Sequence, residues 1–218
     1  MEKVSPFFGK CWYKALLFVF LTTSNFEAFS QAEEFLTYGE LQRLENEALT
    51  SENLEKLRKL SQIHVSKARK ENNGIEVARG HYYRVVIEEP DLAMAYSDSI
   101  ILATKNSNHL NYPTLGYILK GHLHYGSGNF QEALDNFLKA YNLALKKGND
   151  EHQREISIAI AAIRNLHGQH SAAADLYRKS LDLLKKKKNF EITHYEDYIT
   201  LLYNLSSVSY THSEPTRH

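Results

Sequence analysis

The sequence contains very little cysteine, tryptophan and proline: 1 Cys, 1 Trp and 4 Pro among 218 residues. A single cysteine excludes a disulfide framework within the chain and any zinc site built on several thiolates. The few prolines, together with only 10 glycines, exclude collagen-like and proline-rich chains. An excess of charge of one sign is also lacking, because 26 Lys+Arg balance 26 Asp+Glu. This balance argues against a strongly basic nucleic-acid surface, and we expect no nucleic-acid partner.

The first thirty residues have the three-part layout of a secretory signal peptide. Three lysines precede the apolar run 15–21, and the small-x-small sequence 28–30 comes directly before Gln31. The apolar run is far shorter than the roughly 20 residues needed to span a bilayer. We therefore expect a signal peptide at 1–30, export to the periplasm or the medium, and no membrane insertion after cleavage. A retained N-terminal anchor is the alternative.

After a lead-in at 31–48, which we expect to be helical, the chain repeats itself every 40 or 41 residues. Segment 121–147 aligns with 161–187 without a gap, so that Gly128 falls on Gly168 and Phe137 on Tyr177. A period of this length predicts stacked supersecondary units that bury a continuous core. The predicted array at 49–212 comprises a half-unit 49–72, units 73–112, 113–152 and 153–193, and an incomplete unit 194–212, before a polar tail at 213–218.

Each unit is predicted to contain two helices. The second helix carries small and aromatic side chains on one stripe at helical spacing, as at Ala133, Phe137 and Ala140. We expect Gly128 to form the turn between the two helices, because glycine accepts a positive φ at little cost. Pro90 suits the first turn of a helix, where its missing N–H is no loss.

The second helices also end in bases, at 67–70, Lys105, 146–147 and 185–188. Because cations are favoured at the negative end of a helix dipole, we expect these side chains to stabilise the helix C-termini. A polybasic contact with anionic lipid or nucleic acid is the alternative for the run 185–188.

The run Gly128-x-Phe130-x-x-Ala133-x-x-x-Phe137-x-x-Ala140, with Tyr117 and Gly121 upstream, resembles a tetratricopeptide repeat. The resemblance covers roughly residues 50–210 and implies an all-α fold, a right-handed superhelical array of antiparallel helix hairpins. The period exceeds the ~34 residues of that family and would also suit HEAT-type repeats, but the polar connections hold the excess. The repeat-signature positions are Gly80, Tyr83, Tyr96, Tyr117, Gly121, Gly128, Phe130, Ala133, Phe137, Ala140, Gly168, Ala173 and Tyr177.

The resemblance also implies a scaffold that binds a protein or peptide partner, and not an enzyme. In such arrays the first helix of each unit lines the concave face, where aromatic, amide and cationic groups suit peptide recognition. The candidate peptide-binding residues are His81, Arg84, His122, Tyr125, Asn165, Tyr203 and Asn204, with Ser207 and Tyr210 beyond them.

Two further expectations concern the ends of the chain. An exported leader before degenerate repeats is similar to the N-terminal sensor halves of certain bacterial signalling regulators. A truncated sensor portion of a transcriptional regulator or histidine kinase, without its transmembrane and output domains, is therefore the alternative function. The apolar final helix makes self-association a further expectation.

No residue pattern predicts catalysis, a cofactor or a metal ion. His122 and His124 are two residues apart and diverge on a helix, while His167 and His170 stand on either side of Gly168. The segment 125–128 contains two glycines, Gly126 and Gly128, but it lacks the Lys-Ser/Thr pair of a phosphate-binding loop. We therefore expect no catalytic residue, no cofactor and no metal site.

Overall fold

The computed structural model describes residues 36–213, and the expected signal peptide at 1–30 and residues 214–218 of the tail lie outside the described residues. Every regular element of the described part is an α-helix. The helices are α2 (Tyr38–Thr50), α3 (Leu54–Lys70), α4 (Gly74–Ile87), α5 (Pro90–Thr104), α6 (Thr114–Gly126), α7 (Phe130–Lys147), α8 (Asp150–Leu166), α9 (His170–Lys185), α10 (Phe190–Thr193) and α11 (Tyr195–Ser213).

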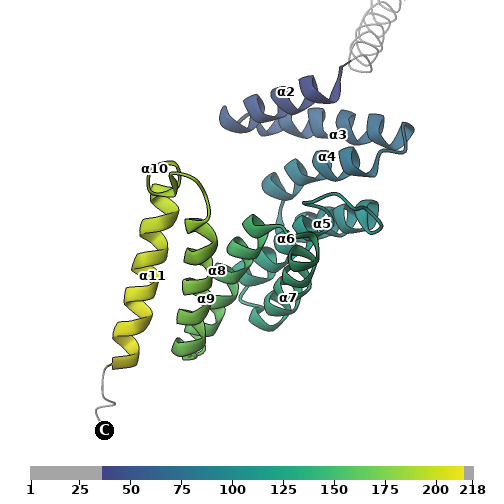
Figure 1. Cartoon of the computed structure of the whole chain (residues 1–218). Helices are drawn as coiled ribbons and strands as arrows, with labels where there is room; N and C mark the ends of the chain where they lie inside the picture. The colour runs from purple at the N-terminus through teal and green to yellow at the C-terminus, as the bar shows by residue number, and fades with distance from the viewer. Residues whose placement is uncertain (1–35, 214–218) are drawn as a thin grey trace, which may run out of the picture.

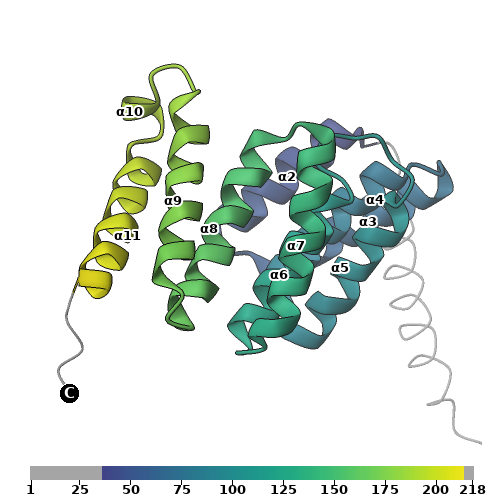
Figure 2. The ribbon, with the colours of Figure 1, turned by 60° about the horizontal axis from the view of Figure 1, so that its bottom comes forward.

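Consecutive helices pack as antiparallel pairs that stack along a curved path from α2 to α11 (Figure 1). The pairs are α2–α3, α4–α5, α6–α7 and α8–α9, and α11 packs on α9. Figure 2 shows the same stack from a second direction, with α8, α9 and α11 in succession at one end. The prediction of an all-α, tetratricopeptide-like solenoid of helix pairs is confirmed. The predicted lead-in contains α2 and the predicted half-unit contains α3, and the structure joins these two helices in the first pair.

Short polar side chains and glycines set the ends of the helices. The side chains of Asn53, Asn73 and Asn149 accept hydrogen bonds from the first backbone N–H groups of α3, α4 and α8. Pro90 occupies the first turn of α5. The turns inside the third and fourth pairs contain Gly128 and Gly168 at φ +76° and +71°, a backbone conformation that favours glycine. These local features thus mark the starts of α3, α4, α5 and α8 and the turns inside the third and fourth pairs.

The core between the helices is built from the small and aromatic stripe of each second helix. Ala133, Phe137 and Ala140 of α7 are completely buried and pack with Ile118 of α6 and Ile156 of α8. Ala173 and Tyr177 take the corresponding places on α9 and pack against Leu201 of α11. Each second helix therefore contacts both its own first helix and the first helix of the next pair, which makes the stack continuous.

Three of the bases at the ends of the second helices contact other elements. Lys147 Nζ donates to the backbone carbonyls of Ser107, His109 and Tyr112 in the segment before α6, at 3.0, 2.6 and 2.7 Å. Lys186 and Lys187 pair with Asp150 and Glu151 at the start of α8. Lys147 stands in the last turn of α7 and Lys186 and Lys187 directly follow α9, so their place at helix C-termini is as predicted, but their side chains also contact acceptors on other elements.

No helix within residues 36–213 is long and apolar enough to cross a membrane. Nor does the range contain a group of three or more His, Cys, Asp or Glu side chains arranged to hold a metal ion.

Candidate functional site

The first helices α6 and α8 lie side by side and present one polar pair on their common face. His122 Nε2 of α6 is 3.6 Å from Glu155 Oε1 of α8, and about half of each side chain is exposed. The ring of His122 also lies edge-on to Phe137, with ring centroids 5.1 Å apart. His122 is thus fixed on its inner side by the core and leaves its outer side open to a ligand.

Two more candidate residues lie near the C-terminal ends of α6 and α8. Tyr125 is half-buried and packs edge-on against Phe130, at 5.5 Å between centroids. His170 Nδ1 donates a hydrogen bond of 2.8 Å to the Asn165 side-chain oxygen. These contacts join each first helix to the start of its second helix, so Tyr125 and Asn165 present only part of their surface to solvent.

His81 and Arg84 of α4 lie inside the packing and not on an open face. His81 is only 5% exposed, and its ring is 5.2 Å from that of Tyr96 on α5. Burial and the nearby charges of Arg69 and Arg84 lower the pKa of His81 to about 4, so its ring is neutral at pH 7. Arg84 stacks on Tyr96 at 4.8 Å and pairs with Glu88 at 2.8 Å. Helix α4 is rotated further into the core than the sequence spacing predicted.

The remaining candidates belong to α11, at the far end of the stack. Tyr203 is 71% exposed, whereas Asn204 is half-buried. Ser207 is exposed, and the side chain of Tyr210 lies outside the described residues. The candidate residues therefore do not converge on one site. His122, Tyr125 and Asn165 lie on the first helices α6 and α8. His81 and Arg84 are packed within the fold, and Tyr203 faces away from α9.

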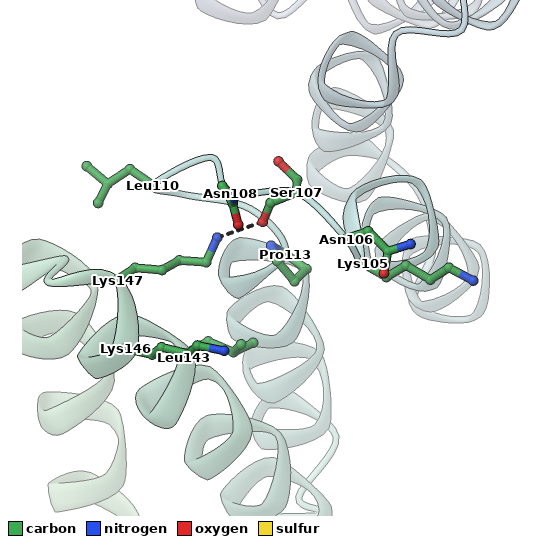
Figure 3. Close-up of a pocket in the computed structure, with 9 residues that line it drawn as sticks. All are labelled: Lys105, Asn106, Ser107, Asn108, Leu110, Pro113, Leu143, Lys146 and Lys147. Carbon is green, nitrogen blue, oxygen red and sulfur yellow. Dashed lines mark hydrogen bonds between the residues drawn. The ribbon is translucent and has the colours of Figure 1, made fainter.

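A groove that sequence reasoning missed runs across the ends of the second helices. It consists of three adjoining hollows of about 350, 360 and 440 Å³, which we call the basic groove. The first and second hollows share Gly74, Leu102 and Ala103, and the second and third share Lys105, Asn106 and Ser107. Figure 3 shows the third hollow, with Lys105 and Lys146 on opposite sides and Lys147 directed to Ser107. The recurring bases were the sequence signal for this groove, but they were assigned to helix ends.

The comparison with known families bears on the two pairs that form the middle and end of the stack. Residues 115–186, which run from α6 to α9, match the family described as tetratricopeptide repeat. These two pairs are therefore similar to tetratricopeptide repeats. The match supports a tetratricopeptide-repeat protein, a fold that generally serves as a non-enzymatic scaffold for protein partners. No curated protein matches the chain.

A buried ionic cluster, which was not predicted from the sequence, joins the helices α2, α3 and α4. His64 of α3 is completely buried, with Nδ1 2.9 Å from Glu45 of α2 and Nε2 3.0 Å from Glu76 of α4. Burial by itself lowers the pKa of His64, but the two carboxylates outweigh it and raise the pKa above its usual range. With a carboxylate at each ring nitrogen, the imidazolium form satisfies both acceptors. The cluster therefore joins three successive helices and has a structural place in the fold.

Proposed function

We propose that this chain is an exported tetratricopeptide scaffold that binds a protein or peptide partner on the concave face of its first helices. The observation that carries the proposal is the position of His122 and Glu155 on neighbouring first helices, within the region that matches the repeat family. Solenoids of this kind use an extended concave surface for recognition. The partner is a protein or peptide, and its identity is left to experiment.

The chemistry of this face fits a polypeptide with mixed polar and apolar side chains. His122 supplies a donor and an aromatic ring, Glu155 supplies an acceptor, and Tyr125 adds a half-buried phenol. Even as an ion pair, an exposed contact of this kind would contribute little to folding stability, typically about 0–1 kcal/mol, so a ligand can replace the 3.6 Å contact at little cost. A partner can therefore replace the polar contact between His122 and Glu155 with contacts of its own.

A pull-down from an envelope fraction tests the proposal with matched variants. The tagged full chain should recover a specific protein that His122→Ala/Glu155→Ala no longer retains. The control Asp135→Ala/Lys139→Ala truncates one acidic and one basic side chain at exposed positions on the second helix α7 and should retain that protein. Recovery of no protein above background, or equal loss with both double variants, would overturn the proposal.

Export is proposed on the layout of residues 1–30 alone. Intact-mass measurement of the chain purified from its native compartment should give an N-terminus at Gln31. A mass that includes residues 1–30 would show the retained anchor instead. The alternative of a regulator's sensor portion stays a prediction, without a structural observation in its favour.

Self-association is proposed through the side of α11 that faces away from α9. Leu201 and Val208 bury one side of α11 in the core, while Tyr195, Ile199 and Tyr203 remain 60%, 43% and 71% exposed. Tyr195 and Tyr203 each lie four residues from Ile199 and therefore share its face of the helix. In an antiparallel pair centred on Ile199, Tyr195 of one copy would meet the partner's Tyr203, as a two-fold symmetric contact requires.

A further inference from the structure

The basic groove has cations that recur with the repeat, one at the end of each of three second helices. Arg69 stands in the last turn of α3, Lys105 directly follows α5, and Lys146 stands in the last turn of α7. All three are exposed, and none pairs with a carboxylate of the described residues 36–213. No aspartate or glutamate of this part of the chain lines any of the three hollows. The groove thus has uncompensated positive charge.

The last helix pair shows which group occupies the corresponding place when the chain supplies it. Forty residues after Lys146 and Lys147 stand Lys186 and Lys187. Lys186 Nζ is 3.3 Å from Asp150 Oδ2, and Lys187 pairs with Glu151, both from the first turn of α8. In that pair, carboxylates at the start of the first helix neutralise the cations at the end of the second.

The two preceding pairs lack carboxylates at those positions. Forty residues before Asp150 and Glu151 stand Leu110 and Asn111, in the segment before α6. Helix α4 begins with Gly74 and Ile75, and the acid of its first turn, Glu76, contacts His64 and Arg79. Lys147 Nζ instead donates to carbonyls of the segment before α6, whereas Lys146 and Lys105 form no ion pair within residues 36–213. The cations at the ends of α5 and α7 therefore lack the carboxylate partners that α8 supplies to Lys186 and Lys187.

From this pattern we infer that the basic groove binds an extended acidic peptide, whose carboxylates occupy the places that Asp150 and Glu151 fill in the last pair. The inference rests on the proposed scaffold function and adds a second binding face with its own partner chemistry. Leu102 and Leu110, which line the groove between the cations, are 68% and 51% exposed and would be covered by apolar side chains of the peptide.

One buried polar atom in the first hollow also lacks a partner. Arg69 can only donate, so the contact of 3.4 Å between its guanidinium and His81 Nε2 makes Nε2 the acceptor. The neutral ring then has its proton on Nδ1, which has no hydrogen-bond partner among the described residues. His81 lines the first hollow, and its Nδ1 donor is buried and unsatisfied among residues 36–213.

The lining of the groove favours a peptide over a nucleic acid. Single-stranded nucleic acids bind positive grooves by stacking their bases on aromatic side chains. Apart from the buried His81, the three hollows contain no aromatic side chain and are lined by Arg69, lysines, amides, small residues and aliphatic side chains. Aliphatic contacts between cations suit a chain that alternates acidic and apolar residues.

A pair of model peptides tests the inference. Five repeats of Glu-Leu-Pro form a polyproline II helix, with three residues per turn and a rise of ~3.1 Å per residue, so its glutamates follow one face about 9 Å apart. Fluorescence anisotropy with the full chain should show binding of this peptide about tenfold tighter than of the Gln-Leu-Pro counterpart. Binding should weaken as salt is raised, because exposed charges are screened.

Matched lysine variants locate the binding. Lys105→Ala/Lys146→Ala should weaken the Glu-Leu-Pro peptide about tenfold, as expected for the loss of two exposed ion pairs. The control Lys139→Ala/Lys188→Ala removes two exposed lysines that do not line the groove and should leave binding unchanged. Circular dichroism checks that all variants are folded. The inference would be overturned if the peptide did not bind, if glutamate were not preferred over glutamine, or if both double variants lost binding equally. Equal competition by an oligothymidylate of fifteen nucleotides would also overturn it.

The failure of this inference can be told apart from failure of the scaffold proposal. If the pull-down depends on His122 and Glu155 while the Glu-Leu-Pro peptide does not bind, the concave face is supported and the groove inference is overturned. If the peptide binds through Lys105 and Lys146 while no protein is recovered, the groove is supported and the concave-face proposal is overturned.

Discussion

The ring of Phe137 on α7 lies directly against the backbone of Gly121 on α6. A Cβ atom at Gly121 would be 2.5 Å from Phe137 Cε1 and 2.8 Å from Cζ, which is too close for carbon atoms that are not bonded to each other. Phe137 is itself completely buried among Ile118, Ile156 and Ile160, so its ring cannot move aside without disturbing the third and fourth pairs. This one contact sets how closely α6 and α7 approach.

We predict that Gly121→Ala destabilises the chain by about 1–3 kcal/mol, the usual cost of overpacking a core. The control is Gly126→Ala at the end of the same helix, where an added Cβ would have nothing within 4 Å. Because alanine restricts the unfolded chain more than glycine, Gly126→Ala should be neutral or stabilising by about 0.4–1 kcal/mol. Urea denaturation of the two variants measures the difference, and equal stabilities would contradict the packing described for Gly121.

Lys147 is predicted to hold the segment between α5 and α6 in place. Lys147→Met keeps the apolar stem but removes three charge-assisted hydrogen bonds to backbone carbonyls, and should cost about 2–3 kcal/mol. Amide hydrogen exchange should also become faster in residues 105–113. Lys146→Met is the matched control, since Lys146 is exposed and makes none of these bonds, and it should change stability by less than about 0.5 kcal/mol. Similar behaviour of the two variants would contradict this role of Lys147.

The cluster Glu45–His64–Glu76 predicts that stability falls as the pH rises from 7 to 9. The folded-state pKa of His64 is raised, so its contribution is complete below the unfolded value of 6.5 and is lost as the pH passes through the folded value. His81 and His152 have lowered pKa values because of burial, and they therefore titrate below this window. Free energies of unfolding from urea titrations at several pH values measure the effect.

Glu45→Gln provides the comparison for that pH profile. The amide can still accept from His64 Nδ1, but one of the two charges that raise the pKa of His64 is gone. The variant should therefore lose less stability between pH 7 and 9 than the wild type. A wild-type stability that is constant or rises over this range, or an identical slope in the variant, would refute the ionised cluster.

Self-association through α11 is predicted to depend on Ile199 and Tyr203. The double variant Ile199→Asn/Tyr203→Ser should be monomeric by sedimentation velocity at concentrations where the wild type forms a dimer, because Ile199 is at the centre of the exposed stripe and Tyr203 is at one end of it. Leu145→Ser removes a comparably exposed apolar side chain from α7 and should leave the dimer intact. A monomeric wild type, or a dimer that survives the double variant, would rule out this interface.

The parts of the fold that could be predicted are those that depend on local sequence. Gly128 and Gly168 were identified because a turn with positive φ needs glycine, and Phe137 because it repeats at helical spacing with small residues. These signals act over a few residues and recur every forty, so one sequence is enough to recognise them. They account for the helix pairs and for the order in which the pairs stack.

The side-chain partners between helices could not be predicted in the same way. His64 meets Glu45 and Glu76 from two different helices, and only the packing of α2 and α4 against α3 brings the three together. His81 was expected on an open face, but the rotation of α4 within the stack buries it against Tyr96. A helical pattern gives the period of a helix, while its rotation relative to both neighbours is set by the whole core.

The measurement that tests the central claim most directly is the pull-down with the full chain and its two matched double variants. A binding scaffold with its site on the first helices predicts one protein that is recovered by the wild type, lost with His122→Ala/Glu155→Ala and kept with Asp135→Ala/Lys139→Ala. Recovery of no specific protein, or of the same protein with all three chains, would contradict the claim that the concave face binds a partner.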